Sequence, residues 1–291
     1  MSRAPWRGTG DQCDTAGEQG SDGAPSRRLA GVDAAIFERD GALFVPGEIA
    51  RGPWDPRAQH GGPPSALAAR AIEHHEPEGA GRVARLTIEL LRPVPLTPIE
   101  VRTRTLRPGK KVQLVEAALF ADDVEVVRAT GLRVREKAVA LPADVSAAAP
   151  LPDPRSLPHA RFTRMEGPSF ADAMEIVPVV GTPGESGPGT AWFRLGVDVV
   201  AGEETSPLQR VAAAADFGNG ISAVVDWDAG WLFINPDLTV YLHRYPVGEW
   251  VALEALTHVS GTGVGMAEAA LYDETGRIGR SMQSLLLDQL P

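Results

Sequence analysis

The sequence predicts an α+β protein built as a tandem duplication, with one central helix and a long antiparallel sheet in each copy. Leu86–Pro93 (LTIELLRP) reappears as Leu238–Tyr245 (LTVYLHRY), an offset of 152 positions (238 − 86). Val115–Phe120 reappears as Ala267–Tyr272 at the same offset (267 − 115). Two segments in one register indicate a duplicated folding unit, because solenoid repeats have far shorter periods of about 20–50 residues.

The first copy is expected to begin with a strand over Phe37–Pro46, followed by a loop rich in proline and glycine. A helix is predicted from near Pro64 to about Glu73, because the first helical turn does not need the N–H that proline lacks. Alternating apolar residues and turn signals then predict an antiparallel meander of four strands: Val83–Leu91, Ile99–Leu106, Val112–Phe120 and Val124–Val134.

The second copy repeats this order. Ser206 can cap a helix that starts at Pro207. The small residues of Ala212–Ala215 give this helix no charged face, so we expect the sheet to wrap around it. The strands of this copy are predicted near Ala191–Val197, Trp231–Leu242, Trp250–His258, Val264–Tyr272 and Ile278–Leu287.

Composition shifts divide the chain into four parts. Residues 1–30 lack an apolar period and are predicted to form a disordered leader. Residues 31–137 form the N-terminal domain, residues 138–160 a linker rich in alanine and proline, and residues 161–291 the C-terminal domain.

Charge and composition exclude several classes of function. A formal charge of −10 argues against broad electrostatic binding of nucleic acid. The sequence has no membrane span and no apolar signal-peptide core, so a soluble, cytoplasmic protein is expected. Cys13 is the single cysteine, which excludes a disulfide framework and a thiolate metal cluster.

The two copies differ at polar positions. At the 152 offset, Val83 corresponds to Asn235 and Gly131 to Gln283, and Pro64 falls opposite Asp216. The first copy is therefore predicted to have a structural role, and the second copy to carry the functional site.

A buried helix wrapped by an antiparallel sheet, duplicated in tandem, resembles the double-hotdog acyl-CoA thioesterases of the thioesterase II type. The resemblance covers roughly residues 35–135 and 190–290. The motifs that carry it are His60-Gly61-Gly62 before the first helix, Leu91-Arg92-Pro93 after the next strand, Asp216, His243-Arg244 and Gln283. It implies a tandem double-hotdog fold, an acyl-CoA substrate and no cofactor or metal, and it leaves a homo-oligomer open.

The same resemblance implies the catalytic residues. Asp216 and Gln283 match the family's aspartate and glutamine, whereas Asn235 stands where the best-known members have threonine. An amide can still donate to and accept from a water molecule. Asp237, two residues along the same predicted strand, is expected on the same face and is the alternative carboxylate.

These residue types suit thioester hydrolysis. Asp216 can act as a general base on a water that Asn235 and Gln283 orient. The turn at Gly61-Gly62 is a candidate oxyanion site, because glycine permits close approach and a helix N-terminus has free donors. His60 remains open as a ligand, a base or a loop residue, and His60, Gly61, Gly62 and Asp237 are the predicted substrate-binding residues.

Two other functions remain in competition. Hotdog hydratases pair an aspartate with a histidine five residues later, whereas Asp216 is followed at that distance by Ile221. A non-catalytic binder of acyl thioesters is the second alternative. Further candidates are Arg92, Lys110, Lys111 and Arg244 for phosphate binding, and Trp54, Trp227 and Trp231 for an acyl tunnel.

Overall fold

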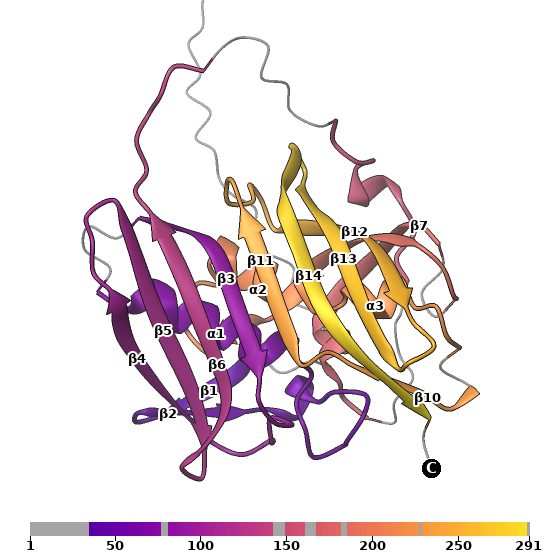
Figure 1. Ribbon diagram of the computed structural model, residues 1–291, viewed down its shortest axis with the longest axis horizontal. Helices are drawn as coiled ribbons and strands as arrows, with labels where there is room; N and C mark the ends of the chain where they lie inside the picture. The colour runs from indigo at the N-terminus through magenta and orange to yellow at the C-terminus, as the bar shows by residue number, and fades with distance from the viewer. Residues whose placement is uncertain are drawn as a thin grey trace, which may run out of the picture.

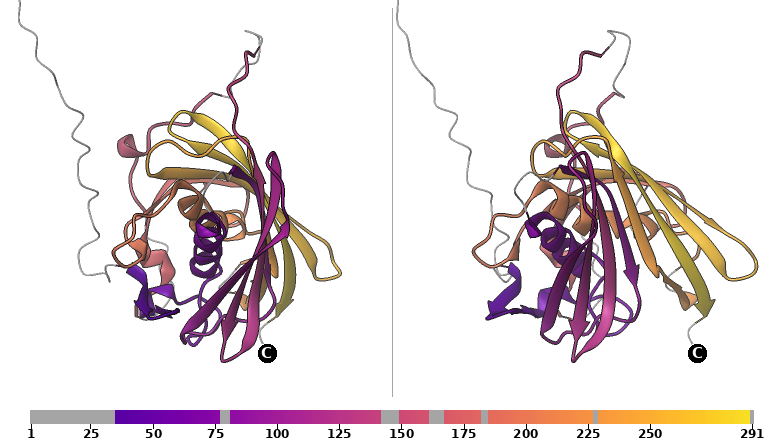
Figure 2. Two further views of the ribbon diagram at one scale, coloured as in Figure 1. Left: turned by 90° about the vertical axis from the view of Figure 1, so that its left-hand side faces the viewer. Right: turned by 60° about the vertical axis from the view of Figure 1, so that its left-hand side comes forward.

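The computed structural model describes residues 35–76, 81–141, 149–160, 167–181, 185–226 and 229–289. A curved, mainly antiparallel sheet wraps around two helices, α1 (Gly62–His74) and α2 (Pro207–Ala215), as Figures 1 and 2 show. The predicted tandem α+β class is confirmed. In the described part of the chain, no helix has the length and apolar character needed to cross a membrane. The predicted leader, residues 1–30, lies outside the described residues.

The first half follows the predicted order. The segment predicted as one strand is a hairpin of β1 (Ala35–Asp40) and β2 (Leu43–Pro46), because Gly41 turns the chain with a positive φ of 60°. The meander strands end within one residue of their predicted limits. The remaining elements of this half are η1 (Glu48–Ala50), β3 (Arg82–Leu90), β4 (Ile99–Arg107), β5 (Val112–Ala121) and β6 (Val124–Val134).

The second half contains elements that the sequence did not predict, namely β7 (Met174–Val180) and β9 (Asp198–Val200). The strand predicted over Trp231–Leu242 is divided into β10 and β11, because Pro236 has no N–H for the ladder. The other elements are η2 (Pro154–Ser156), η3 (Phe170–Ala173), β8 (Gly189–Leu195), α3 (Gly218–Ile221), β10 (Trp231–Ile234), β11 (Asp237–Leu242), β12 (Trp250–Val259), β13 (Val264–Asp273) and β14 (Gly276–Gln289).

The two halves share one sheet, joined where β3 pairs antiparallel with β11 (Figure 1). At the centre of this junction Thr87 lies opposite Thr239, its own counterpart at the 152 offset. Their hydroxyl oxygens are 3.5 Å apart. A pseudo-twofold axis therefore passes through this pair of threonines.

The hydrogen-bond register within each half also repeats. Val115 of β5 pairs with Gly131 of β6, and the counterparts Ala267 and Gln283 pair in β13 and β14. The duplication inferred from two short segments thus extends through the meander of both halves.

The helices do not follow the 152 offset. Pro64 lies in the first turn of α1, whereas Asp216 is the C-cap of α2, so the predicted superposition of these two residues is wrong. The cause is the connection to the meander: α3 and β10 lie between α2 and β11, whereas a short segment links α1 to β3. The meander positions keep the offset because nothing is inserted between their strands.

The two helices pack antiparallel inside the sheet. Gly62, at the N-terminus of α1, approaches the carbonyl of Ala213 in the last turn of α2 so closely that an added Cβ would lie 2.8 Å from it. Ala212, Ala213, Ala214 and Ala215 are all buried, as the absence of a charged face predicted. Larger side chains here would overpack the core at a cost of about 1–3 kcal/mol. This packing brings the start of α1 to the end of α2.

Candidate active site

A cavity of about 590 Å³ lies where the N-terminus of α1 meets the C-terminus of α2. Both halves of the chain line it, with segments 51–61 and 90–94 from the first half and 216–220 and 232–236 from the second. Its size and mainly apolar lining are typical of a small-molecule site.

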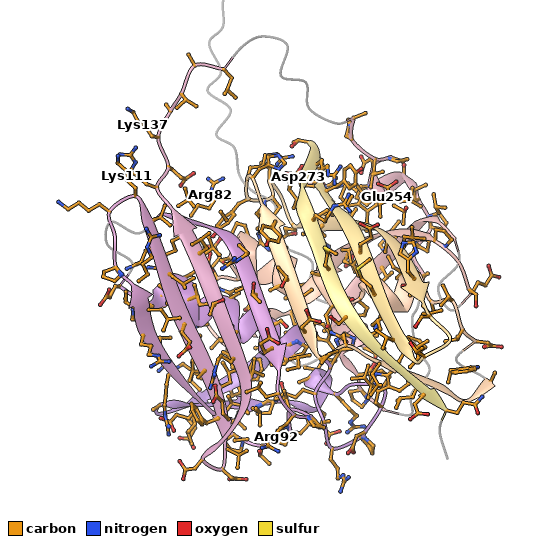
Figure 3. The ribbon with its side chains drawn as sticks, in the orientation of Figure 1. Arg82, Arg92, Lys111, Lys137, Glu254 and Asp273 are labelled. Atoms are coloured by element: carbon orange, nitrogen blue, oxygen red, sulfur yellow. The ribbon has the colours of Figure 1, made fainter. Side chains whose placement is uncertain are left out.

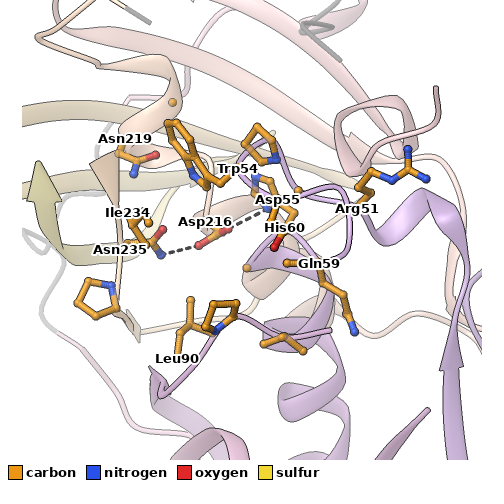
Figure 4. A pocket seen from close by; sticks show the side chains of 18 of the residues that line it. Arg51, Trp54, Asp55, Gln59, His60, Leu90, Asp216, Asn219, Ile234 and Asn235 are labelled. Atoms are coloured by element: carbon orange, nitrogen blue, oxygen red, sulfur yellow. Dashed lines mark hydrogen bonds and ion pairs between the residues drawn. The ribbon is translucent and has the colours of Figure 1, made fainter. Parts of the chain in front are cut away.

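Asp216 projects from the end of α2 into the wall of this cavity and is 4% exposed. Its Oδ1 accepts a hydrogen bond from Nδ2 of Asn235 at 2.7 Å and one from Nε2 of Gln283 at 3.2 Å. Its Oδ2 lies 2.9 Å from Nδ1 of His60, as Figure 4 shows together with the Asn235 contact. The predicted carboxylate is thus surrounded by three polar side chains from three separate segments.

The start of α1 stabilises this carboxylate. A Cβ on Gly61 would lie 2.6 Å from Oδ2 of Asp216, so only glycine allows this approach. The positive end of the α1 dipole then faces the negative charge, which compensates for the position of Asp216 at the negative end of α2. Pro63 and Pro64 have no N–H, so Gly61 and Gly62 supply the free donors of the first turn.

Asp216 is ionised at neutral pH. Burial, the largest influence, raises its pKa, but the charge and hydrogen bond of His60, followed by Asn235 and the N–H of Gly62, outweigh burial. The pKa of Asp216 therefore lies below its ordinary value.

His60 is held in one orientation. Its ring packs against those of Phe170 and Phe217, with centroids 5.2 and 4.7 Å away. A nitrogen lone pair 2.9 Å from a carboxylate would be repelled, so this contact assigns the hydrogen to Nδ1.

Asn235 and Asp237 face different ways. Asn235 follows β10 and lines the cavity, whereas the carboxylate of Asp237 accepts a hydrogen bond from the N–H of Ser284 at 2.7 Å. The break at Pro236 interrupts the strand alternation on which the expectation of a shared face rested. Asp237 is not among the residues that line the cavity, so the structure does not bring it to Asp216.

Gln283 lies on β14 and is 2% exposed. Besides the carboxylate, its Nε2 contacts the main-chain oxygen of Asp216 at 3.3 Å. Its Oε1 has no hydrogen-bond partner among the described residues and lies beside Gly218, where a Cβ would be 3.2 Å away. Gln283 therefore supports Asp216 from the sheet side.

The opposite end of the helix pair carries a different carboxylate. Glu73, near the end of α1, accepts a hydrogen bond from Oγ of Ser206 at 2.5 Å, at the start of α2. Burial, the largest influence, raises the pKa of Glu73, and the hydrogen bonds of Ser206 and Gln209 offset this only in part. The pKa shifts of Glu73 and Asp216 thus have opposite signs.

Apolar and main-chain contacts fill this second end. Gly131, the counterpart of Gln283, faces the side chain of Ile72, which a Cβ at Gly131 would overlap. The buried Arg133 donates to the carbonyls of Ile72 and His75, the latter at 2.6 Å. The polar side chains at this end form hydrogen bonds with one another or with the last carbonyls of α1.

The predicted phosphate-binding residues separate in space. Arg92 lines the cavity and lies at the opposite end of the molecule from Lys111 (Figure 3), and neither Lys110 nor Lys111 lines the cavity. Arg244 pairs through both terminal nitrogens with Asp273, which is fully buried.

Arg92 and Arg244 are counterparts at the 152 offset, and their environments differ. At that offset the counterpart of Asp273 is Ala121, so the first half has no equivalent acid for Arg92. No residue of the described part of the chain forms an ion pair or hydrogen bond with the Arg92 side chain. Arg92 is therefore available at the cavity.

Sequence reasoning missed several lining residues. Gln59 donates from Nε2 to the carbonyl of Pro95 at 2.8 Å, and Asn219 lines the cavity three residues after Asp216. The short spacing of two polar residues in Asp216-Phe-Gly-Asn219 is the sequence feature that could have indicated Asn219. Of the three tryptophans proposed for an acyl tunnel, Trp54 lines the cavity, Trp231 does not, and Trp227 lies outside the described residues.

Within the described residues, no group of three or more histidine, cysteine, aspartate or glutamate side chains is arranged to hold a metal ion.

Comparison with known protein families gives two adjacent matches. Residues 50–134 match the acyl-CoA thioesterase N-terminal domain, and residues 142–287 match the acyl-CoA thioesterase C-terminal domain. A comparison with curated proteins gives no match.

Solved structures share the fold. A conserved hot dog fold protein of unknown function from Alicyclobacillus acidocaldarius is 13% identical, with a TM-score of 0.67 over 89% of this chain and 98% of that one. The tesB protein of Mycobacterium avium subsp. paratuberculosis is 17% identical, with a TM-score of 0.57 over 87% and 95%. An acyl-CoA thioesterase II from Mycobacterium marinum is 15% identical, with a TM-score of 0.57 over 84% and 96%.

Proposed function

Because this chain belongs to the acyl-CoA thioesterase family and is a thioester hydrolase, we propose that it hydrolyses acyl-CoA at the cavity beside Asp216. The observation that carries this assignment is an ionised, buried carboxylate at the wall of an apolar cavity, with His60, Asn235 and Gln283 around it. The apolar lining suits an acyl chain, and the polar cluster suits the thioester.

In the proposed reaction, Asp216 orients and deprotonates a water molecule. The water donates one hydrogen to Asp216 and the other to the amide oxygen of Asn235, for which no partner is found among the described residues. Its oxygen attacks the thioester carbonyl carbon while Asp216 accepts the proton, with His60 holding the carboxylate in place. A positioned base of this kind contributes about 10²–10⁴-fold in rate.

The oxyanion forms beside the first turn of α1. The N–H of Gly62 is directed to the carboxylate of Asp216, because Nδ1 of His60, 3.1 Å away, carries a hydrogen itself, and Pro63 and Pro64 have no N–H. The N–H of Gly61 therefore remains as the donor for the oxyanion. Collapse of the intermediate breaks the carbon–sulfur bond, and the proton held by Asp216 passes to the thiolate, so the products are the free acid and CoA.

Arg92 is the proposed contact for a CoA phosphate. It lines the cavity and lacks the acid that neutralises Arg244. An unpaired guanidinium at a cavity suits phosphate, which it can bind through two nitrogens.

The test is to mix the purified protein with a series of acyl-CoA thioesters and to follow free thiol and acyl-CoA separately. Hydrolysis predicts stoichiometric release of CoA thiol and loss of acyl-CoA. Hydration of an enoyl-CoA without thiol release, or binding without turnover across the series, would overturn the assignment.

A further inference from the structure

Asn219 is a buried amide without a partner. It lies in α3, lines the cavity and is 8% exposed. No residue of the described chain donates to or accepts from its side chain. The side-chain oxygen and nitrogen of Asn219 both keep some contact with solvent, since neither is among the fully buried polar atoms that lack a partner. The amide of Asn219 therefore opens into the cavity.

The other amides that line the cavity each donate from their nitrogen to a protein group. Of the amides that line the cavity, Asn235 donates through its nitrogen to Asp216 and Gln59 to the carbonyl of Pro95, whereas neither the nitrogen nor the oxygen of Asn219 has a partner among the described residues. An amide that is left unsatisfied after burial costs about 1–3 kcal/mol. In the free protein, water can satisfy Asn219 through the cavity, but a bound ligand that displaces this water has to replace its hydrogen bonds.

The position of Asn219 points to the acyl part of the substrate. Asn219 belongs to the second half of the chain, and Figure 4 shows it across Asp216 from Arg51 and Gln59. Arg92 comes from the first half and has no acid partner among the described residues, so it suits a phosphate of CoA, whereas Arg51 pairs with Glu48. Apolar residues of both halves line the cavity, and those of the second half, Leu232 and Ile234, line it together with Asn219.

We propose that Asn219 selects acyl groups that carry a hydrogen-bonding oxygen, such as a hydroxyl group on the chain. This inference rests on the proposed function. An unsubstituted alkyl chain displaces the water from Asn219 and leaves the amide unpaired, whereas a hydroxyl group both donates to and accepts from it. A site with a buried polar group discriminates against the analogue that lacks the matching group.

The test compares octanoyl-CoA with its 3-hydroxy and 5-hydroxy derivatives, in the wild type and in Asn219→Leu, which keeps the approximate shape. We expect the wild type to show a kcat/KM about tenfold higher for a hydroxylated substrate than for octanoyl-CoA. Asn219→Leu should bring this ratio close to one, mainly by faster octanoyl-CoA hydrolysis, and Asn219→Ser should retain part of it. Thermal unfolding would verify that each variant is folded.

Equal kcat/KM values for the three substrates in the wild type would overturn the inference without any variant. It would also be overturned if Asn219→Leu slowed all three substrates by one common factor, because Asn219 would then contact the thioester or CoA. Absence of turnover with every acyl-CoA would overturn the proposed function itself, and this inference with it.

Discussion

The two ends of the α1–α2 pair are related by the pseudo-twofold axis, yet their carboxylates lie in different environments. At one end, Asp216 is ionised and meets a cavity. At the other, burial raises the pKa of Glu73, and Ser206 and Arg133 close the ends of the helices. The two copies therefore share the same strand register, whereas the side chains at the ends of their helices differ.

A single exchange in the sheet illustrates this divergence. Gln283 supports the carboxylate of Asp216, whereas its counterpart Gly131 leaves space that Ile72 fills. One position therefore determines whether the sheet presents an amide or accepts an apolar side chain from the helix.

The strongest test of the comparison exchanges each carboxylate for its amide. Asp216→Asn removes the proposed base and should lower kcat by about 10²-fold or more with little change in substrate binding. Glu73→Gln should leave the rate per folded molecule unchanged, because Glu73 lies at the closed end. Steady-state kinetics on both folded variants measure this. A rapid Asp216→Asn enzyme, or a slow Glu73→Gln enzyme, would reverse the assignment of the two ends.

Adding one methyl group at each end should separate rate from stability. Gly61→Ala would place Cβ against the Asp216 carboxylate and should lower kcat at least about tenfold by displacing it. Gly131→Ala would overlap Ile72 and should cost about 1–3 kcal/mol of unfolding free energy without slowing the folded enzyme. Urea unfolding and kcat, measured on the same samples, report both quantities. Equal losses of kcat in the two variants would contradict the comparison.

Removal of the sheet amide should have a smaller effect than removal of the carboxylate. Gln283→Ala loses one hydrogen bond to Oδ1 but leaves His60 and Asn235 in contact with Asp216. We expect kcat to fall by about tenfold, as for one hydrogen bond to a charged group. A loss as large as that of Asp216→Asn would assign Gln283 a direct part in the reaction.

The two arginine counterparts should also respond differently. Arg92→Gln should raise KM for acyl-CoA by about two- to fivefold, as for one exposed ion pair, and leave kcat unchanged. The matched substrate is an acyl-pantetheine, which has no phosphate and should show no change. Arg244→Gln should instead lower the thermal midpoint, because it leaves the buried Asp273 unpaired. A KM increase for both substrates would place Arg92 away from the phosphates.

The pH dependence of stability should be the most subtle difference. Asp216 has a lowered pKa, so it contributes stability above its ordinary value of 3.8 that is lost as the pH falls through the folded pKa. Glu73 has a raised pKa, so the folded state loses stability as the pH rises above 4.5 through that raised pKa. Against the wild type, Asp216→Asn should thus lose most near neutral pH, whereas Glu73→Gln should gain there. Thermal midpoints across the acid range would show whether the two differences have opposite signs.

The sequence predicted the strands of both meanders well, because their alternation of apolar and polar residues is local. Unpredicted β7 lies in a segment with no counterpart among the detected repeats, and its role becomes visible only when it pairs with β8. Asp237 shows the limit of alternation as a guide, because Pro236 interrupts the strand and changes the face that follows.

The polar set could be named from sequence, but its contacts could not. The approach of His60 to Asp216 depends on antiparallel packing of two helices from different halves. No local pattern encodes a contact across 156 positions (216 − 60). Asn219 lies only three positions after Asp216 in the sequence, but this spacing is also common for turn residues. Only its burial and its lack of a partner among the described residues distinguish it from an ordinary turn residue.

The pairing of Thr87 with Thr239 has a consequence for biosynthesis. Until the second half has been translated, β3 lacks its β11 neighbour and presents unpaired N–H and C=O groups at the edge of a hydrophobic sheet. At about 5–20 residues per second, the ribosome needs roughly 8–30 seconds to synthesise the 152 residues (239 − 87) that separate Thr239 from Thr87. During that interval the nascent first half can pair with the same strand of a neighbouring chain. We therefore expect chaperone demand to concentrate on this edge before the second half is complete.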